Sequence, residues 1–276
     1  MRAAACLIAV LSAAASAPAE ETPLAQEWDY AAAMRKVAAG GKARAGVVLH
    51  VGDSITYSAA YGAWARGGKG RTPADQAVLK WMHAGADDDT DGWWLARVDH
   101  PAGGRSHTAC SGMRADELLV GGKRKMPALS AMLSQYKPAV VVLMIGTNDV
   151  SAGRKAEAVA ADVGKAVEQI LSAGAVCVLS TIPPHPAKPD LAAEVNKRLR
   201  ALAKTRSLPL IDYEAEILAR RRDDWNGTLL GKNDVHPTGG PTTGEPTAGN
   251  LRTSGYLLRG WLTVRKLAEV KARVFD

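Results

Sequence analysis

Short apolar runs rich in Val, Ile and Leu recur along the chain, separated by longer amphipathic stretches. Buried parallel strands are typically continuous apolar runs, and each needs a long crossover before the next strand begins. The pattern therefore predicts an α/β fold with a parallel sheet covered by helices. The expected strands are residues 47–51, 106–110, 139–145, 175–180 and 208–211, the second being the least apolar.

Helical spacing of apolar residues predicts helices over residues 74–83, 155–171, 191–205 and 256–270. With 276 residues, 47% of them hydrophobic, the chain is long enough to bury a sizeable core. No internal repeat or linker divides it, so we expect one domain over residues 20–276.

The first nineteen residues have the composition of a secretory signal. Arg2 precedes a small and apolar run over residues 3–17, and the Ala-Pro-Ala at 17–19 offers a cleavage site. The run is short and mostly alanine, so we expect no membrane span. The interpretation is a signal peptide over residues 1–19 and a secreted or periplasmic protein. The alternative is an alanine-rich N-terminus on a cytosolic protein.

The formal net charge is +7, which favours anionic partners at first sight. The basic residues are, however, scattered among acids. The only runs are 123–125 and 220–222, and two aspartates follow the second. We interpret both as solvated segments and expect no nucleic-acid partner.

Polar segments stand where two of the expected strands end and before the last expected helix. They are Gly-Asp-Ser-Ile-Thr at 52–56, Gly-Thr-Asn-Asp at 146–149 and Asp-Val-His-Pro at 234–237. Taken alone, each has a structural explanation, as a helix N-cap, a strand-to-helix turn and a structural histidine.

Taken together and in this order, these segments resemble the SGNH (GDSL-type) hydrolase family. Residues 111–116 match its glycine block and residues 181–184 also look similar, so the resemblance runs from about residue 47 to residue 267. It implies a three-layer α/β/α sandwich with a flavodoxin-like parallel five-stranded sheet in the order 2-1-3-4-5.

The resemblance also implies a serine esterase mechanism. Ser54 would be the nucleophile and His236 the base that takes its proton. The N–H groups of Ser54 and Gly112 and the side chain of Asn148 would form the oxyanion hole. An acyl-enzyme would then be released by water, with no metal or organic cofactor.

The acidic partner of His236 is less regular. The family usually places an aspartate three residues before the histidine, where this chain has Asn233, and Asp234 comes one residue later. We favour Asp234, because a carboxylate orients the imidazole and stabilises its charged form. In the alternative, Asn233 or a backbone carbonyl orients His236 in a serine-histidine dyad.

Mature chains would keep only Cys110 and Cys177, too few for a disulfide framework. In the family strand order these cysteines lie on strands three positions apart, about 14 Å, which is beyond disulfide reach. We expect both thiols to be unpaired.

Other sites fit the sequence less well. The Gly-x-Ser-x-Gly elbow of α/β-hydrolases is absent around Ser54, and Gly40-Gly41-Lys42 lacks the spacing of a phosphate loop. Asp87, Asp89 and Asp91 open like a calcium loop, but Val98 stands where the closing glutamate would be, which favours a solvated acidic loop. The remaining histidines lack metal-ligand spacing: His50, His83, His100, His107 and His185.

We expect the substrate to be a small-molecule or polysaccharide ester with a short acyl group, such as O-acetyl on carbohydrate. Two long loops, 57–104 and 238–253, start at the expected site and could build a cleft. Trp93, Trp94 and Trp225 lie in or near probable loops, where flat rings suit sugars as well as packing. The alternatives are a lysophospholipase or thioesterase on the same triad, and a catalytically silent carbohydrate-binding protein.

Overall fold

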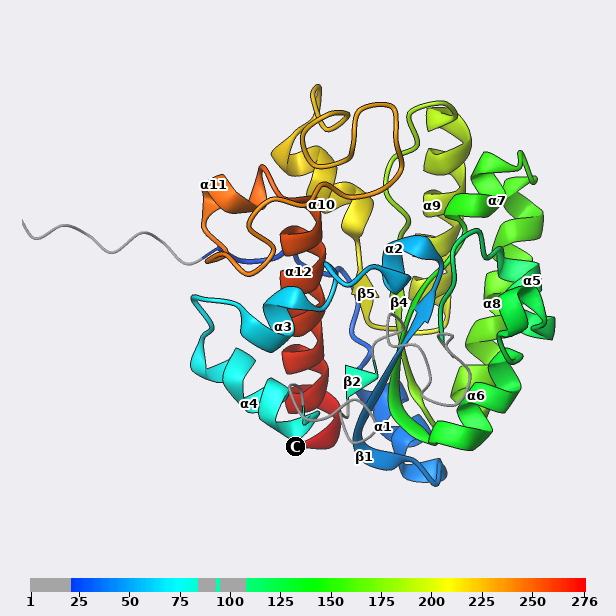
Figure 1. Ribbon diagram of the computed structural model, residues 1–276. Helices are drawn as coiled ribbons and strands as arrows, with labels where there is room; N and C mark the ends of the chain where they lie inside the picture. The colour runs from blue at the N-terminus through cyan, green and yellow to red at the C-terminus, as the bar shows by residue number, and fades with distance from the viewer. Residues whose placement is uncertain (1–20, 84–92, 95–107) are drawn as a thin grey trace, which may run out of the picture.

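The computed structural model describes residues 21–83, 93–94 and 108–276. The expected signal segment, the acidic loop with Asp87, Asp89 and Asp91, and two of the histidines, His100 and His107, lie outside these residues. Within them, the chain forms a parallel sheet between two layers of helices (Figure 1).

The sheet has the strand order β2-β1-β3-β4-β5, and every neighbouring pair is parallel. This order and the three-layer architecture confirm the expected fold. Four strands form the body of the sheet and a two-residue strand adds the β2 edge. The bounds are β1 Arg44–Gly52, β2 Trp93–Trp94, β3 Pro138–Met144, β4 Val176–Ser180 and β5 Leu210–Ile211.

The location expected for the second strand, residues 106–110, was wrong. The strand beside β1 is Trp93–Trp94, paired with Val48 and Leu49. In the expected segment, Ala109 makes one isolated parallel bridge to Gly52 at the end of β1. The physical reason is composition, because tryptophan favours extended backbone, whereas Ser-His-Thr-Ala-Cys offers little apolar surface to a sheet.

The four expected helices are confirmed, with ends that differ by at most two residues. They are α4 Pro73–Trp81, α8 Ala156–Ser172, α9 Pro189–Thr205 and α12 Gly255–Val270. The other helices are mostly shorter: α1 Ala31–Gly40, α2 Ser54–Tyr57, α3 Ala63–Gly67, α5 Ala115–Val120, α6 Leu129–Tyr136, α7 Thr147–Ser151, α10 Tyr213–Arg220 and α11 Ala248–Leu251.

The two helical layers differ in how they cover the sheet. Helices α5, α6, α8 and α9 lie on one side, and α1 and α12 on the other, with α3 and α4 packed outside α12 (Figure 1). Helix α12 is therefore enclosed from both sides, and its buried residues run around its whole circumference. It contacts β5 of the sheet, and Arg259 on it reaches the turn that follows β1 and carries Ser54.

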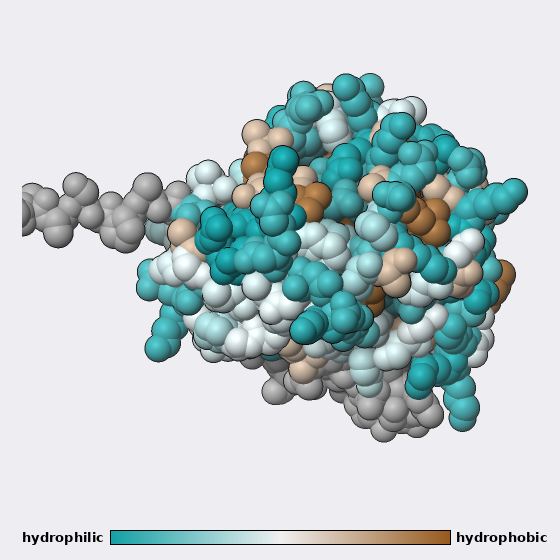
Figure 2. All heavy atoms as spheres, turned by 90° about the horizontal axis from the view of Figure 1, so that it is seen from above, coloured by the Kyte–Doolittle hydropathy of each residue, from teal (hydrophilic) through white to brown (hydrophobic). Residues whose placement is uncertain are grey.

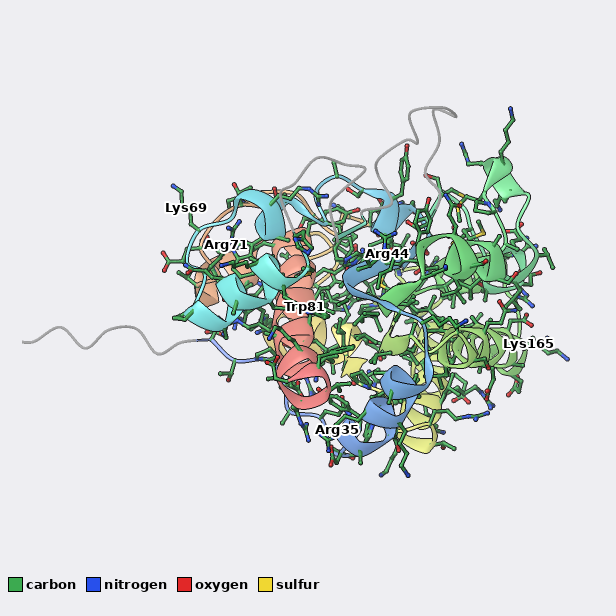
Figure 3. The ribbon with its side chains drawn as sticks, turned by 90° about the horizontal axis from the view of Figure 1, so that it is seen from below. Arg35, Arg44, Lys69, Arg71, Trp81 and Lys165 are labelled. Carbon is green, nitrogen blue, oxygen red and sulfur yellow. The ribbon has the colours of Figure 1, made fainter. Side chains whose placement is uncertain are left out.

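The lower end of the molecule, opposite the end to which β1 carries Ser54, has several basic side chains on its surface (Figure 3). Arg35, Arg44, Arg71 and Lys165 lie on different parts of this face and do not gather into one patch (Figure 3). Trp81 packs there against Phe275 near the C-terminus, with ring centroids 5.2 Å apart. Among the residues that the structure describes, no helix is both long and apolar enough to cross a membrane.

Candidate active site

Ser54 stands at the point where β1 turns into helix α2. A side chain at Gly52 would place its Cβ 2.3 Å from the carbonyl oxygen of Met144 on the neighbouring strand, so only glycine fits at this turn. The next residue, Asp53, is the N-cap of α2, and its Oδ1 accepts the N–H of Ile55 at 3.0 Å. The turn therefore presents Ser54 at the carboxyl end of the sheet.

The side chains of Ser54, His236 and Asp234 form one continuous hydrogen-bonded chain. Ser54 Oγ lies 2.9 Å from Nε2 of His236, and Nδ1 of His236 lies 2.7 Å from Oδ1 of Asp234. A carboxylate accepts only, so Nδ1 carries the proton and Nε2 is free to accept from the serine hydroxyl. This is the arrangement that a serine nucleophile and its base require.

The conformation of the turn before His236 explains why Asp234, and not the residue at position 233, is the acidic partner of His236. Asn233 has a left-handed backbone, with φ of 56°. Its Oδ1 accepts from Nδ2 of Asn226, and its backbone N–H donates to Oδ1 of Asn226, so its side chain is engaged by Asn226. Asp234 instead accepts both the backbone N–H and the ring N–H of His236, on the same Oδ1.

Ionisation of Asp234 agrees with this contact. Partial burial of Asp234 opposes its charge, but the hydrogen bonds from His236 outweigh burial and hold the pKa of Asp234 below its ordinary value. The carboxylate is therefore charged at neutral pH. Both side chains remain accessible, at 43% exposure for His236 and 52% for Asp234.

The backbone N–H groups of Ser54 and Gly112 are candidates for an oxyanion hole. Ser54 begins its helix, where an N–H has no partner within the helix. Gly112 has φ of +78°, a conformation that favours glycine. For neither N–H does the described part of the chain supply an acceptor. Both are thus open to an oxyanion.

Asn148, at the start of α7, supplies the third candidate donor. Its Nδ2 donates to the carbonyl oxygen of Met113 at 3.0 Å, which ties the amide to the segment that carries Gly112. The other hydrogen points to Oδ2 of Asp53 at a longer 3.3 Å. A substrate oxyanion would compete with Asp53 for this second hydrogen.

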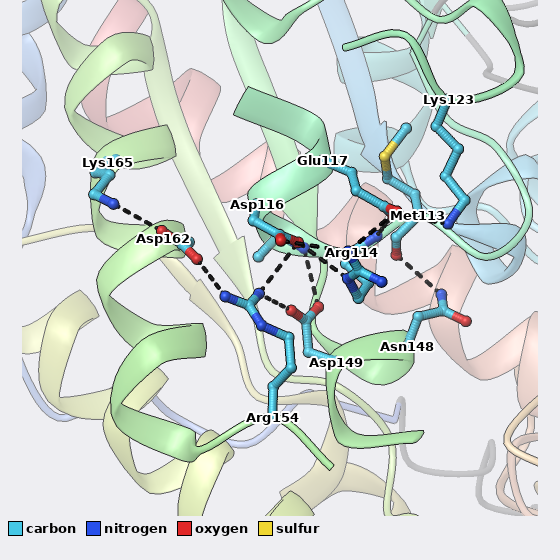
Figure 4. A network of polar contacts seen from close by, with 11 residues as sticks. Met113, Arg114, Asp116, Glu117, Lys123, Asn148, Asp149, Arg154, Asp162 and Lys165 are labelled. Carbon is cyan, nitrogen blue, oxygen red and sulfur yellow. Dashed lines mark hydrogen bonds and ion pairs between the residues drawn. The ribbon is translucent and has the colours of Figure 1, made fainter. Parts of the chain in front are cut away.

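Asp149 also links α7 to the segment that carries Gly112. This role was not foreseen from the sequence. Its carboxylate is fully buried, and Oδ2 accepts the N–H of Ala115, three residues after Gly112, at 3.0 Å. Its Oδ1 is paired with Arg154 (Figure 4). Asn148 and Asp149 together therefore lock the Gly112 segment onto α7.

Arg154 extends this network to the neighbouring helices. It contacts Asp162 of α8 at 2.7 Å and Asp116 of α5 at 3.3 Å, and Lys165 pairs with Asp162 at 2.8 Å (Figure 4). Desolvation of the buried Asp149 raises its pKa even though Arg154 opposes the change. The ion pair with Arg154 therefore offsets the cost of burying the charged Asp149 carboxylate.

The surface seen from above, the side toward which β1 carries Ser54, is mainly hydrophilic. Outside the grey atoms, hydrophobic residues form only small separate patches on it (Figure 2). Two described cavities, of about 380 and 440 Å³, lie elsewhere, beside β5 and residues 24–28. Neither is lined by any of the predicted site residues.

The comparisons with known proteins agree with the fold. Residues 50–239, more than half of the chain, match the model of the GDSL-like Lipase/Acylhydrolase family, so the chain belongs to this family. It is accordingly a serine hydrolase that acts on ester bonds. No curated protein matches the sequence.

Three solved structures of similar fold share low sequence identity with this chain. A carbohydrate esterase of family 3 from Talaromyces cellulolyticus has 17% identity and a TM-score of 0.52, over 82% of this chain and 98% of that one. A putative G-D-S-L lipolytic protein from Desulfitobacterium hafniense has 19% identity and a TM-score of 0.50, over 79% and 98%. An acetyl-xylooligosaccharide esterase from Geobacillus has 16% identity and a TM-score of 0.50, over 80% and 93%.

Proposed function

We propose that this chain is an exported esterase that removes short acyl groups, above all O-acetyl groups on carbohydrate, with Ser54 as nucleophile, His236 as base and Asp234 as the acid. The observation that carries the proposal is the hydrogen-bonded chain from Ser54 through His236 to Asp234, at 2.9 and 2.7 Å.

In the first half of the reaction, Ser54 Oγ attacks the ester carbonyl carbon while its proton passes to Nε2 of His236. The carbonyl π electrons move onto oxygen, and the N–H groups of Ser54 and Gly112 and the amide of Asn148 donate to the oxyanion. Collapse breaks the bond to the alcohol, which leaves with the proton from His236.

In the second half, water attacks the acyl carbon of the Ser54 ester. His236 takes a proton from this water and returns it to Ser54 Oγ as the bond to the acyl group breaks. The carboxylic acid leaves, and the enzyme is restored. Asp234 stays ionised throughout and stabilises the imidazolium that forms twice in each cycle.

The substrate class rests on two supports. Two proteins of similar fold are described as a carbohydrate esterase and an acetyl-xylooligosaccharide esterase. Outside the grey atoms, the upper face is mainly hydrophilic, which suits a sugar ligand, and its described residues form no broad apolar surface of the kind that a long acyl chain would favour (Figure 2). The export component rests on the composition of residues 1–19.

The test is hydrolysis of p-nitrophenyl acetate and release of acetate from acetylated polysaccharide by the protein starting at residue 20. Ser54→Ala and His236→Ala should each abolish turnover with unchanged circular dichroism. An acyl series up to long chains separates this function from a lysophospholipase or thioesterase. Absent hydrolysis in the wild type would favour a silent binding protein.

Ser151 provides a matched control, since its Oγ lies 3.0 Å from Nε2 of His185. There, however, Nδ1 of His185 accepts the N–H of Ala187, so Nε2 carries the proton and cannot act as a base. Ser151→Ala should therefore keep full turnover. A loss equal to that of Ser54→Ala would mean that the wrong serine has been assigned.

A further inference from the structure

A buried arginine on α12 contacts the turn that carries the nucleophile. Arg259 is only 2% exposed. Its Nη1 donates to the carbonyl oxygen of Ile55 at 2.7 Å, and its Nη2 donates to Oγ1 of Thr56 at 2.8 Å. Both acceptors follow Ser54 directly in the chain. A planar fork with two fixed donors therefore holds this turn against the C-terminal helix.

The guanidinium is itself held from the other side. It lies over the ring of Tyr61, 3.8 Å from the centroid. The Tyr61 hydroxyl lies 2.8 Å from Nδ1 of His50 and 3.1 Å from Oγ1 of Thr263. Thr263 in turn donates to the carbonyl oxygen of Arg259 at 2.8 Å. These contacts leave the arginine a single orientation.

The positive charge of Arg259 acts on a buried carboxylate next to Ser54. Asp53 has no exposed surface, and the charged or titratable groups facing it are Arg259 from α12, His236 from its loop, Cys110 and Tyr256. Burial raises the pKa of Asp53 to about 6, and the attraction of Arg259 is among the effects that oppose this rise.

We propose that Arg259 is a positioning residue for the reaction: it fixes the Ser54 turn through its two donors to Ile55 and Thr56. The inference rests on the proposed function, because it assigns support to the same nucleophile. It adds a buried residue of α12 on which turnover depends.

The proposal predicts which kinetic constant changes. Arg259 is buried and contacts the turn that carries Ser54, so its loss should misplace the nucleophile and lower kcat, with little change in KM.

The experiment compares kcat and KM of Arg259→Met, Arg259→Lys and Arg265→Met with p-nitrophenyl acetate. Arg265 lies on the same helix, is also largely buried and pairs with the buried Asp75 at 3.1 Å, in contact with α4 instead of α2. It is therefore the control for a lost buried arginine that does not touch the nucleophile turn.

We expect Arg259→Met to lower kcat at least about tenfold with KM little changed. Arg259→Lys should also lower kcat, since an ammonium keeps the charge but cannot replace the fork. Arg265→Met should change stability without changing kcat.

An active wild type together with an Arg259→Met variant of normal kcat would overturn this inference alone. An inactive wild type would overturn the proposed function as well. If Arg259→Met does not fold, Arg259→Lys decides: lowered kcat at constant KM supports the proposal, and wild-type kcat overturns it.

Discussion

Replacing Asp234 by Asn tests the step of the mechanism that the sequence leaves most open. The substitution keeps the size of the side chain and removes its charge. In the structure, Oδ1 of Asp234 accepts two N–H groups of His236, from the ring at 2.7 Å and from the backbone at 3.3 Å. An asparagine can keep one of these bonds, but its NH₂ can also face Nδ1 and select the wrong tautomer.

The magnitude follows from the charge and its exposure. An imidazolium and a carboxylate about 4 Å apart attract each other by about 1 kcal/mol in water and about 4 kcal/mol at a protein surface. Asp234 is half exposed, which puts it between these limits. At about 1.4 kcal/mol per decade, the lost charge lowers kcat about fivefold to a thousandfold. The wrong tautomer adds to this loss, so we expect about a hundredfold to a thousandfold.

The assay is steady-state hydrolysis of p-nitrophenyl acetate, with kcat measured for Asp234→Asn and Asn233→Ala in parallel. The side chain of Asn233 contacts Asn226 and not His236, so its loss should change kcat less than about threefold. If Asp234→Asn keeps most of the wild-type kcat, the assignment of Asp234 as the acid is wrong. A large loss only in Asn233→Ala would assign the orienting role to the amide.

Further predictions address the oxyanion donors, the cysteines and the buried network. Asn148→Ala should lower kcat about a hundredfold to a thousandfold with a smaller change in KM, because its amide meets charge that develops in the transition state; a change confined to KM would contradict this role. Cys110 and Cys177 are both buried and free, so the unfolded, unreduced protein starting at residue 20 should titrate two thiols, and none would contradict the strand order. Arg154→Met should cost about 3–5 kcal/mol in urea unfolding, because it leaves Asp149 buried without its cation, and a cost below about 1 kcal/mol would refute that dependence.

Much of the fold could be predicted because its signals are local. The runs that became β1, β3 and β4 are mostly apolar and mostly buried, since helices cover both faces of the sheet. The β2 edge was missed because it pairs through only two residues, Val48 and Leu49, and the segment expected there makes a single bridge. A strand of two residues has no periodicity to detect.

In the candidate site, too, some residues could be predicted from local segments of the sequence, and others could not. Ser54, Gly112, Asn148 and His236 stand in segments with distinctive spacing, so the sequence brings them to attention, and the structure brings Ser54, His236 and Asp234 into contact. Whether they catalyse remains a prediction. The choice between Asn233 and Asp234 depends on a left-handed backbone at Asn233 and on its contact with Asn226, and neither can be read from the order of residues.

The supporting residues could not be predicted at all, because their partners lie far away in the chain. Arg259 binds a turn 204 residues before it, and Asp149 binds an N–H 34 residues before it. In a sequence, Arg259 is one more cation among apolar helical positions. Only the packing of α12 against the turn after β1 converts it into a buried donor to the nucleophile turn.

The catalytic residues differ from their supporting residues in exposure, and this difference indicates which parts of the site can be substituted. His236 and Asp234 lie on an open turn, whereas Asp53, Asp149 and Arg259 are buried. Preorganised donors are effective only when their own supports are fixed, and buried ionic contacts with several partners are costly to rearrange. The rigid part of the machinery therefore lies under the sheet edge. The loops above it can vary with the substrate without disturbing the turn that carries Ser54.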